Sequence, residues 1–158
     1  MIDGPYFALT VLGVLGTGLV AGVCFAFSAF VMRGLGSLPP ARGAAAMNAI
    51  NRAATTPVFM ILFMGAALLS AVLAVVTFVL WPEGTVELLV GSALYLVGVF
   101  AVTAAANVPR NGALLRMDPD APETAVYWRS YVREWTLWNH VRTVASAGAA
   151  LSYLLALT

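Results

Sequence analysis

The sequence predicts an all-α protein, an integral membrane four-helix bundle, and three observations lead to this prediction. Of its 158 residues, 61% are hydrophobic and only 9% are charged, whereas about 25% are charged in an ordinary soluble domain. No stretch shows the period-two alternation of a membrane β-strand. Four apolar stretches approach or exceed the ~20 residues that a helix needs to cross the hydrocarbon core. They cover about residues 6–32, 57–81, 86–106 and 141–158.

The first half of the chain predicts two of these spans and a short helix between them. The first stretch is too long for a signal peptide and no basic segment precedes it, so we expect a mature helix. The alanine-rich residues 41–54 predict a helix along the membrane interface. Thr56 followed by Pro57 suits the start of the second span, because proline is favoured at the first helical position.

The second half predicts an antiparallel pair and one long final helix. The connection at Trp81 is short, so the second and third spans should be antiparallel neighbours. Pro109 is expected to end the third span, because proline lacks a donor and clashes with the preceding turn. No breaker follows Pro122. Residues 121–140 should therefore continue into the last span as a helix of about 35 residues, which would extend into the cytoplasmic interface. Residues 1–158 would then form one domain.

Every basic residue is an arginine, and the arginines lie in or beside the two long loops. The positive-inside rule therefore predicts that both loops are cytoplasmic and both termini outside, as in a bacterial inner membrane or plasma membrane. The arginines are mixed with carboxylates, which argues against a nucleic-acid partner. Cys24 is the single cysteine, so neither an internal disulfide nor a cysteine metal site is expected. Gly18 and Gly22 favour close helix packing within the bundle, with a homo-oligomer as the alternative.

Polar residues gather at the predicted cytoplasmic ends of three spans. Arginine at the interface often reaches toward lipid headgroups, and a lone histidine is often a structural group. Ionisable residues within a membrane are nevertheless functional candidates by default, because they need a cavity or a partner. Trp128, Tyr131, Trp135 and Trp138 form an aromatic stripe on the last helix. The polar residues are Asn48, Asn51 and Arg52 before the second span, Asn107 and Asn111 after the third, and Asn139, His140 and Arg142 at the start of the fourth.

Two short motifs resemble a known family. They are Asn107-x-Pro109-x-Asn111 and Trp138-Asn139-His140-x-Arg142, with "MNAIN" before the second span. In these motifs and in its four apolar stretches, the chain resembles the small membrane proteins of the anthrone oxygenase-like family. The resemblance implies a four-helix membrane fold. For the polyketide-pathway members it implies oxidation of an anthrone to an anthraquinone by O₂, without an obvious metal or flavin.

That chemistry needs a base, oxyanion stabilisation and a dry aromatic slot. His140 is the candidate base, because an unperturbed imidazole titrates near ~6.5. Arg142 is the candidate for the developing oxyanion, with hydrogen bonds from Asn139 or Asn107. No cofactor or metal is expected, and haem bound through His140 is the less favoured option. The remaining candidates, for binding a small planar lipophilic substrate, are Asn51, Asn111, Trp128, Trp135 and Trp138.

The alternative is a non-catalytic membrane protein. Such a protein would bind or transport a lipophilic, quinone-like molecule, or support a larger membrane complex. The absence of a second titratable group of suitable pKa beside His140 favours this alternative. The histidine next to an arginine and several amides favours an enzyme.

Overall fold

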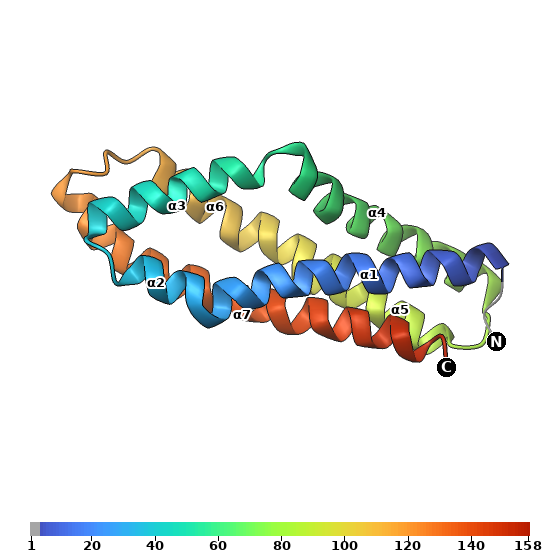
Figure 1. The fold of residues 1–158 in the computed structure, drawn as a ribbon. Coiled ribbons are helices and arrows are strands. Elements are labelled where there is room, and N and C mark those ends of the chain that lie inside the picture. Colours follow the sequence, from blue (N-terminus) through green and yellow to red (C-terminus); the bar gives the residue numbers. More distant parts are fainter. Residues whose placement is uncertain (1–3) are drawn as a thin grey trace.

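The described chain is a long bundle of helices with both ends of the chain at one end of the bundle (Figure 1). The structure is a computed structural model and describes residues 4–158. All regular secondary structure in this part is helical, and four long helical rods run side by side. Two of the rods, the first and the third, contain π-helical segments and short helices. The elements are α1 (Gly4–Ala26), η1 (Phe27–Val31), α2 (Met32–Gly36), α3 (Pro40–Ala54), α4 (Pro57–Leu80), α5 (Thr85–Ala93), η2 (Leu94–Ala101), η3 (Thr103–Asn107), α6 (Val108–Leu115) and α7 (Pro122–Leu155).

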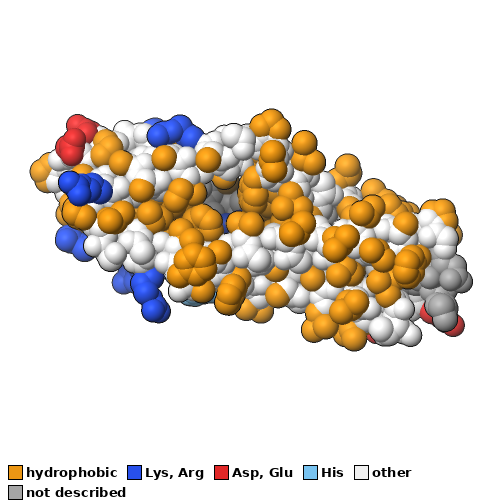
Figure 2. All heavy atoms as spheres, viewed as in Figure 1, with side chains coloured by type: hydrophobic (Ala, Val, Ile, Leu, Met, Phe, Trp, Pro, Cys, Tyr) orange, Lys and Arg blue, Asp and Glu red, His pale blue; other side chains and the backbone are white. Residues whose placement is uncertain are grey.

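The predicted fold class is confirmed. Within residues 4–158, three helices are long and apolar enough to cross a membrane: Gly4–Gly36, Pro57–Leu80 and Thr85–Leu115. The fourth rod, α7, is less apolar because its first half carries Glu123, Arg129, Arg133 and Glu134, and Arg142 follows. Figure 2 shows apolar side chains over the middle of the bundle and arginines at the end opposite the two termini. We call this arginine-bearing end the basic end.

The short helix between the first two rods lies at the basic end, as expected. Pro57 starts α4 directly after Thr56, which is the N-cap. Position 43 in α3 requires glycine, because a Cβ there would lie 2.7 Å from the ring of Trp128. Trp128 is therefore packed between α3 and α7. The helix buries its small residues against the long rod instead of lying free on a membrane surface.

The first and third rods are longer than the sequence predicts. The first continues to Gly36, and the third passes through Pro109 and ends at Leu115. The π-helical segment η3 ends at Asn107, two residues before Pro109, and a π turn is wider than an α turn, so it can accommodate the proline ring. The side chain of Arg110 adds a local bond, since its Nη1 donates to the carbonyl of Ala106 at 2.8 Å.

Beyond Pro109 the extended rod is held to α7 by an ion pair. Arg110 Nη2 and Nε donate to Glu134 Oε2 at 2.9 and 3.1 Å. Both side chains are partly exposed, so we expect only a small contribution to stability. The contact nevertheless fixes where α6 lies along α7. Its position matters because α6 carries one of the polar residues described below.

Glycines set the close approach of the third and fourth rods. A Cβ at Gly98 would lie 2.5 Å from the Cβ of Ala145. A Cβ at Gly18, on the first rod, would meet Ala150 at 4.0 Å, whereas one at Gly22 would meet nothing within 4 Å. Of the pair that the sequence singled out, only Gly18 therefore faces another helix within the described chain.

Candidate functional site

A cavity of about 550 Å³ lies between all four rods, below the turn that joins α3 to α4. On the face shown in Figure 2 the surface is hollowed beside α3, and a spot of basic colour is visible inside. The walls are mainly apolar. The cavity is lined by Val23, Cys24, Phe27, Met47, Ile50, Asn51, Ala53, Ala54, Thr55, Phe59, Met60, Phe63, Met64, Phe100, Thr103, Ala104, Asn107, Val108, Asn111, Trp135, Asn139 and Arg142.

The helix α7 contributes three lining residues through simple helical spacing. Trp135, Asn139 and Arg142 are separated by four and three residues, so they lie on one face of the helix. All three are buried. The same face buries Tyr131 and Trp128 toward the basic end and Ser146 and Ala149 toward the other end, so it is the face that α7 turns to the bundle.

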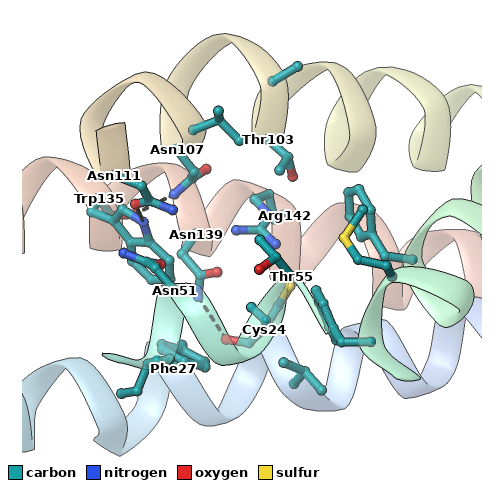
Figure 3. Close-up of a pocket in the computed structure, with 18 of the residues that line it drawn as sticks. Cys24, Phe27, Asn51, Thr55, Thr103, Asn107, Asn111, Trp135, Asn139 and Arg142 are labelled. Carbon is teal, nitrogen blue, oxygen red and sulfur yellow. Dashed lines mark hydrogen bonds between the residues drawn. The ribbon is translucent and has the colours of Figure 1, made fainter. Parts of the chain in front are cut away.

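Arg142 is the main electrostatic feature of the cavity. Its side chain is only 7% exposed, and its Nε has no hydrogen-bond partner. Within residues 4–158 no carboxylate pairs with it, and Figure 3 shows its guanidinium directed into the cavity. A buried cation without a partner is costly. The cavity is therefore suited to an anionic or strongly polarised oxygen, which would supply the missing partner.

Asn139 ties α7 to the first rod at the wall of the cavity. Its Nδ2 donates to the carbonyl of Cys24 at 2.8 Å and to Ser28 Oγ at 2.9 Å. Both partners lie where α1 passes into the π turn of η1. The amide is 1% exposed. Because Nδ2 is engaged with α1, the carbonyl oxygen of the amide faces the other way, toward the cavity (Figure 3).

Asn111 is held by two donors from α7. Its Oδ1 accepts from the Tyr131 hydroxyl at 2.8 Å and from Trp135 Nε1 at 2.9 Å. Tyr131 lies at the basic end of α7, and burial raises the pKa of its phenol above the ordinary value. The phenol therefore keeps its proton at neutral pH and donates. Since Trp135 Nε1 can only donate, the amide of Asn111 cannot be reversed.

Asn107 lies one turn before Asn111 and has the opposite polarity. Its Nδ2 donates to the carbonyl of Trp135 at 3.4 Å, and a carbonyl can only accept. The orientation of this amide is therefore also fixed. Its Oδ1 is buried and has no partner among the described residues. Figure 3 shows this oxygen on the side of the cavity, away from α7.

His140, which the sequence made the candidate base of the site, does not line the cavity. Its ring is exposed and lies outside the cavity, where Nδ1 is 2.9 Å from Ser28 Oγ. It borders a shallow groove on the outside of the bundle, together with Arg33 and Arg133. The reason is helical geometry: one residue after Asn139 is a rotation of about 100°, which carries the imidazole past the wall.

Two of the three predicted tryptophans also lie outside the cavity. Trp128 is buried between α3 and α7 at the basic end, and Trp138 is 37% exposed on the outer side of α7. Only Trp135 lines the cavity. The predicted residues that the structure does bring together are Asn51, Asn107, Asn111, Trp135, Asn139 and Arg142.

The aromatic wall of the cavity is mostly phenylalanine, which sequence reasoning missed. The ring of Phe63 stacks on both Phe59 and Phe100, with ring centroids 6.0 Å apart in each pair and planes inclined by 21° and 24°. Phe27 packs against Trp135 at 5.4 Å. Inside an apolar span nothing distinguishes a phenylalanine that faces a cavity from one that faces lipid, so the sequence held no usable signal.

The chemistry open to the cavity follows from its lining. It offers a flat aromatic surface, one guanidinium, amide donors and amide acceptors. No imidazole or carboxylate is among the lining residues, and Cys24 is the one lining side chain of a type that commonly ligates metals. Such a site can bind a planar aromatic molecule and stabilise a negative charge on one of its oxygens.

Comparison with known proteins identifies the family of the chain. The model of a family described as anthrone oxygenase matches residues 59–152, which is more than half of the chain. The matched region covers nearly all of α4, the third rod and most of α7, and it includes Asn107, Asn111 and Arg142. Comparisons with curated proteins and with solved structures found no match. The chain belongs to the anthrone oxygenase family.

Proposed function

We propose that the protein is a membrane oxygenase that oxidises an anthrone-like, planar phenolic substrate with O₂ in the cavity beneath the α3–α4 turn. The observation that carries the proposal is Arg142, a buried guanidinium without an ion-pair partner in the described chain, next to an aromatic wall. The family to which the chain belongs supports an oxygenase-type reaction.

The reaction that this site would promote proceeds through an anion. Loss of one proton from the ring CH₂ of an anthrone gives an enolate, whose negative charge rests largely on the former ketone oxygen. Arg142 would hold this oxygen in a low-dielectric site, where a preorganised cation stabilises charge far better than water does. The enolate carbon then adds O₂ to give a peroxide anion, which takes up a proton. Elimination of water leaves the quinone, so one O₂ is consumed and one H₂O is formed per substrate.

The cavity offers no ordinary base to remove the proton from the ring CH₂ of the substrate. With no imidazole or carboxylate in the lining, we propose that the proton leaves to water at the opening of the hollow, driven by stabilisation of the enolate at Arg142. The guanidinium is then the main catalytic group, because it stabilises the enolate and so lowers the pKa of the substrate CH₂. This replaces the mechanism in which His140 removes the proton inside the cavity.

The experiment is O₂ consumption by the purified protein in nanodiscs supplied with an anthrone. We expect O₂ uptake and quinone absorbance to rise together in a one-to-one ratio, faster than in empty nanodiscs, where anthrones oxidise slowly on their own. A rate equal to that of empty nanodiscs would contradict the proposal.

The rival function is non-catalytic binding of a quinone-like molecule, and the missing base is the observation that favours it. Binding can be followed through quenching of tryptophan fluorescence, because Trp135 lines the cavity. Saturable quenching by an anthraquinone, combined with no acceleration of anthrone oxidation, would support the rival. Acceleration of oxidation would exclude a purely passive role.

The position of His140 leads to a prediction about its substitution. We expect His140→Ala to keep the oxidation rate within about threefold of the wild-type rate, because the exposed ring lies outside the cavity and substitutions at such positions usually change stability by only ~0.5 kcal/mol. The measurement is the initial rate of quinone formation at saturating substrate. Asn139→Ala is the comparison: Asn139 lines the cavity, so this substitution should lower the rate. A loss on the order of 100-fold in His140→Ala would restore the histidine as the base.

We also propose that the basic end faces the cytoplasm, because arginine-rich loops are retained on that side. Single added cysteines at Ser37 and Thr158 test this orientation. Ser37 and Thr158 are exposed at opposite ends of the bundle, and the native Cys24 is buried. In intact cells a membrane-impermeant maleimide should label the cysteine at position 158 but not the one at position 37. The reverse pattern would invert the orientation.

A further inference from the structure

Asn107 and Asn111 stand out because their amides present opposite polarity to the same part of the cavity. The two residues are four apart and so lie one above the other on a helix face. Asn107 offers an acceptor, Oδ1, which is buried and has no partner among the described residues. Asn111 offers a donor, Nδ2, because its Oδ1 is the atom that accepts from Tyr131 and Trp135. Figure 3 shows both groups directed toward the interior of the cavity.

Neither amide can rotate to change what it offers. Asn111 Oδ1 is occupied by the Tyr131 hydroxyl and Trp135 Nε1, which both donate. Asn107 Nδ2 is directed at the Trp135 carbonyl, which only accepts. Reversing either amide would place two donors or two acceptors against each other. The pattern of one acceptor beside one donor is therefore built into the fold.

We propose that Asn107 and Asn111 form a subsite for a neutral hydroxyl of the ligand, which donates to Asn107 Oδ1 and accepts from Asn111 Nδ2. A hydroxyl is the smallest group that satisfies both, because it carries one donor hydrogen and accepting lone pairs. The subsite is separate from the oxygen at Arg142. The anthrone-like ring system of the ligand comes from the proposed function, on which this inference rests. The inference adds a hydroxyl group on that ring system.

The subsite makes a sharp distinction between two closely related ligands. An anthrone with one outer-ring hydroxyl remote from the ketone can make both hydrogen bonds, whereas its methyl ether can only accept. With the ether bound, Asn107 Oδ1 would stay buried and unpaired. Sites built to pair with a hydroxyl discriminate strongly against ligands that lack its hydrogen, because a buried group is left unsatisfied.

The experiment compares kcat/KM for this hydroxyanthrone and its methyl ether, after subtraction of spontaneous oxidation. In the wild-type protein we expect a preference of about 10-fold or more for the hydroxyanthrone. In Asn107→Leu the ratio should fall close to one. The matched control is Asn48→Leu: Asn48 is also a buried amide with an unpaired Oδ1, but it lies outside the cavity, so the ratio should remain at the wild-type value.

A ratio near one in the wild-type protein would overturn the subsite, whatever the variants do. So would a ratio that survives Asn107→Leu. If neither anthrone is oxidised faster than in empty nanodiscs, the proposed function fails. The subsite is then decided by binding alone: fluorescence quenching by the corresponding hydroxyanthraquinone and methoxyanthraquinone should show the same preference, and equal affinities would overturn it.

Discussion

Replacing Arg142 by methionine should nearly abolish oxidation of an anthrone while making the protein more stable. The guanidinium is buried, has no ion-pair partner within residues 4–158, and faces a cavity with mainly apolar walls. Replacing a buried charge with an apolar side chain of similar length is often stabilising by about 1–4 kcal/mol. Loss of the group that stabilises the oxyanion should lower kcat by about 10²–10³-fold.

Two measurements on the same sample test both parts of this expectation. Thermal unfolding in one detergent gives the stability difference, and initial rates of quinone formation give the activity. Arg129→Met is the control, because Arg129 is on the same helix but exposed, so neither quantity should change much. A less stable, fully active Arg142→Met protein would show that the guanidinium is a structural group with partners inside the bundle.

Gly98→Val should cause the largest loss of stability among single substitutions in the third rod. A Cβ at Gly98 would lie 2.5 Å from the Cβ of Ala145 and 3.9 Å from its Cα, so the backbones of the third and fourth rods would have to separate. Overpacking of this kind usually costs about 1–3 kcal/mol and sometimes more. Because Phe100 lies two residues further along and lines the cavity, activity should fall as well.

The control for this prediction is the same substitution at a glycine with free space. A Cβ at Gly22, on the first rod, would meet nothing within 4 Å. Thermal unfolding of Gly98→Val and Gly22→Val in the same detergent should therefore differ widely, with only the first variant strongly destabilised. If the two were destabilised equally, Gly22 would be in contact with something outside the described chain, such as a second copy of the protein.

The bundle itself could be predicted because composition and apolar length are direct consequences of the membrane. The positions of Asn139 and Arg142 could also be anticipated, since both lie on the face of α7 that continues its buried aromatic residues. His140 was misplaced because its chemistry, and not its helical phase, guided the hypothesis. The exposed ring shows that the position of a residue around its helix decides whether the side chain reaches the cavity.

The third rod could not be predicted in the same way. Two π-helical segments, η2 and η3, cover most of residues 94–107, and each π turn shifts the phase of every residue after it. A helical wheel at 100° per residue therefore misplaces Asn107 and Asn111 relative to α5. The pairing of these amides across to Trp135 and Tyr131 depends on that shift, so only the folded chain reveals it.

The rim of the hollow is polar at Thr55, beside the α3–α4 turn, and apolar at Val23, Met60, Met64 and Val108, which are all more than a third exposed. Water can reach the opening at Thr55, whereas a ligand that enters past the apolar part of the rim comes from the bilayer, where a flat aromatic compound concentrates by partition. Occupancy then follows the mole fraction of ligand in lipid and not its concentration in the buffer. At a fixed total amount of ligand, adding empty vesicles would dilute it and lower the rate, although the aqueous volume stays the same.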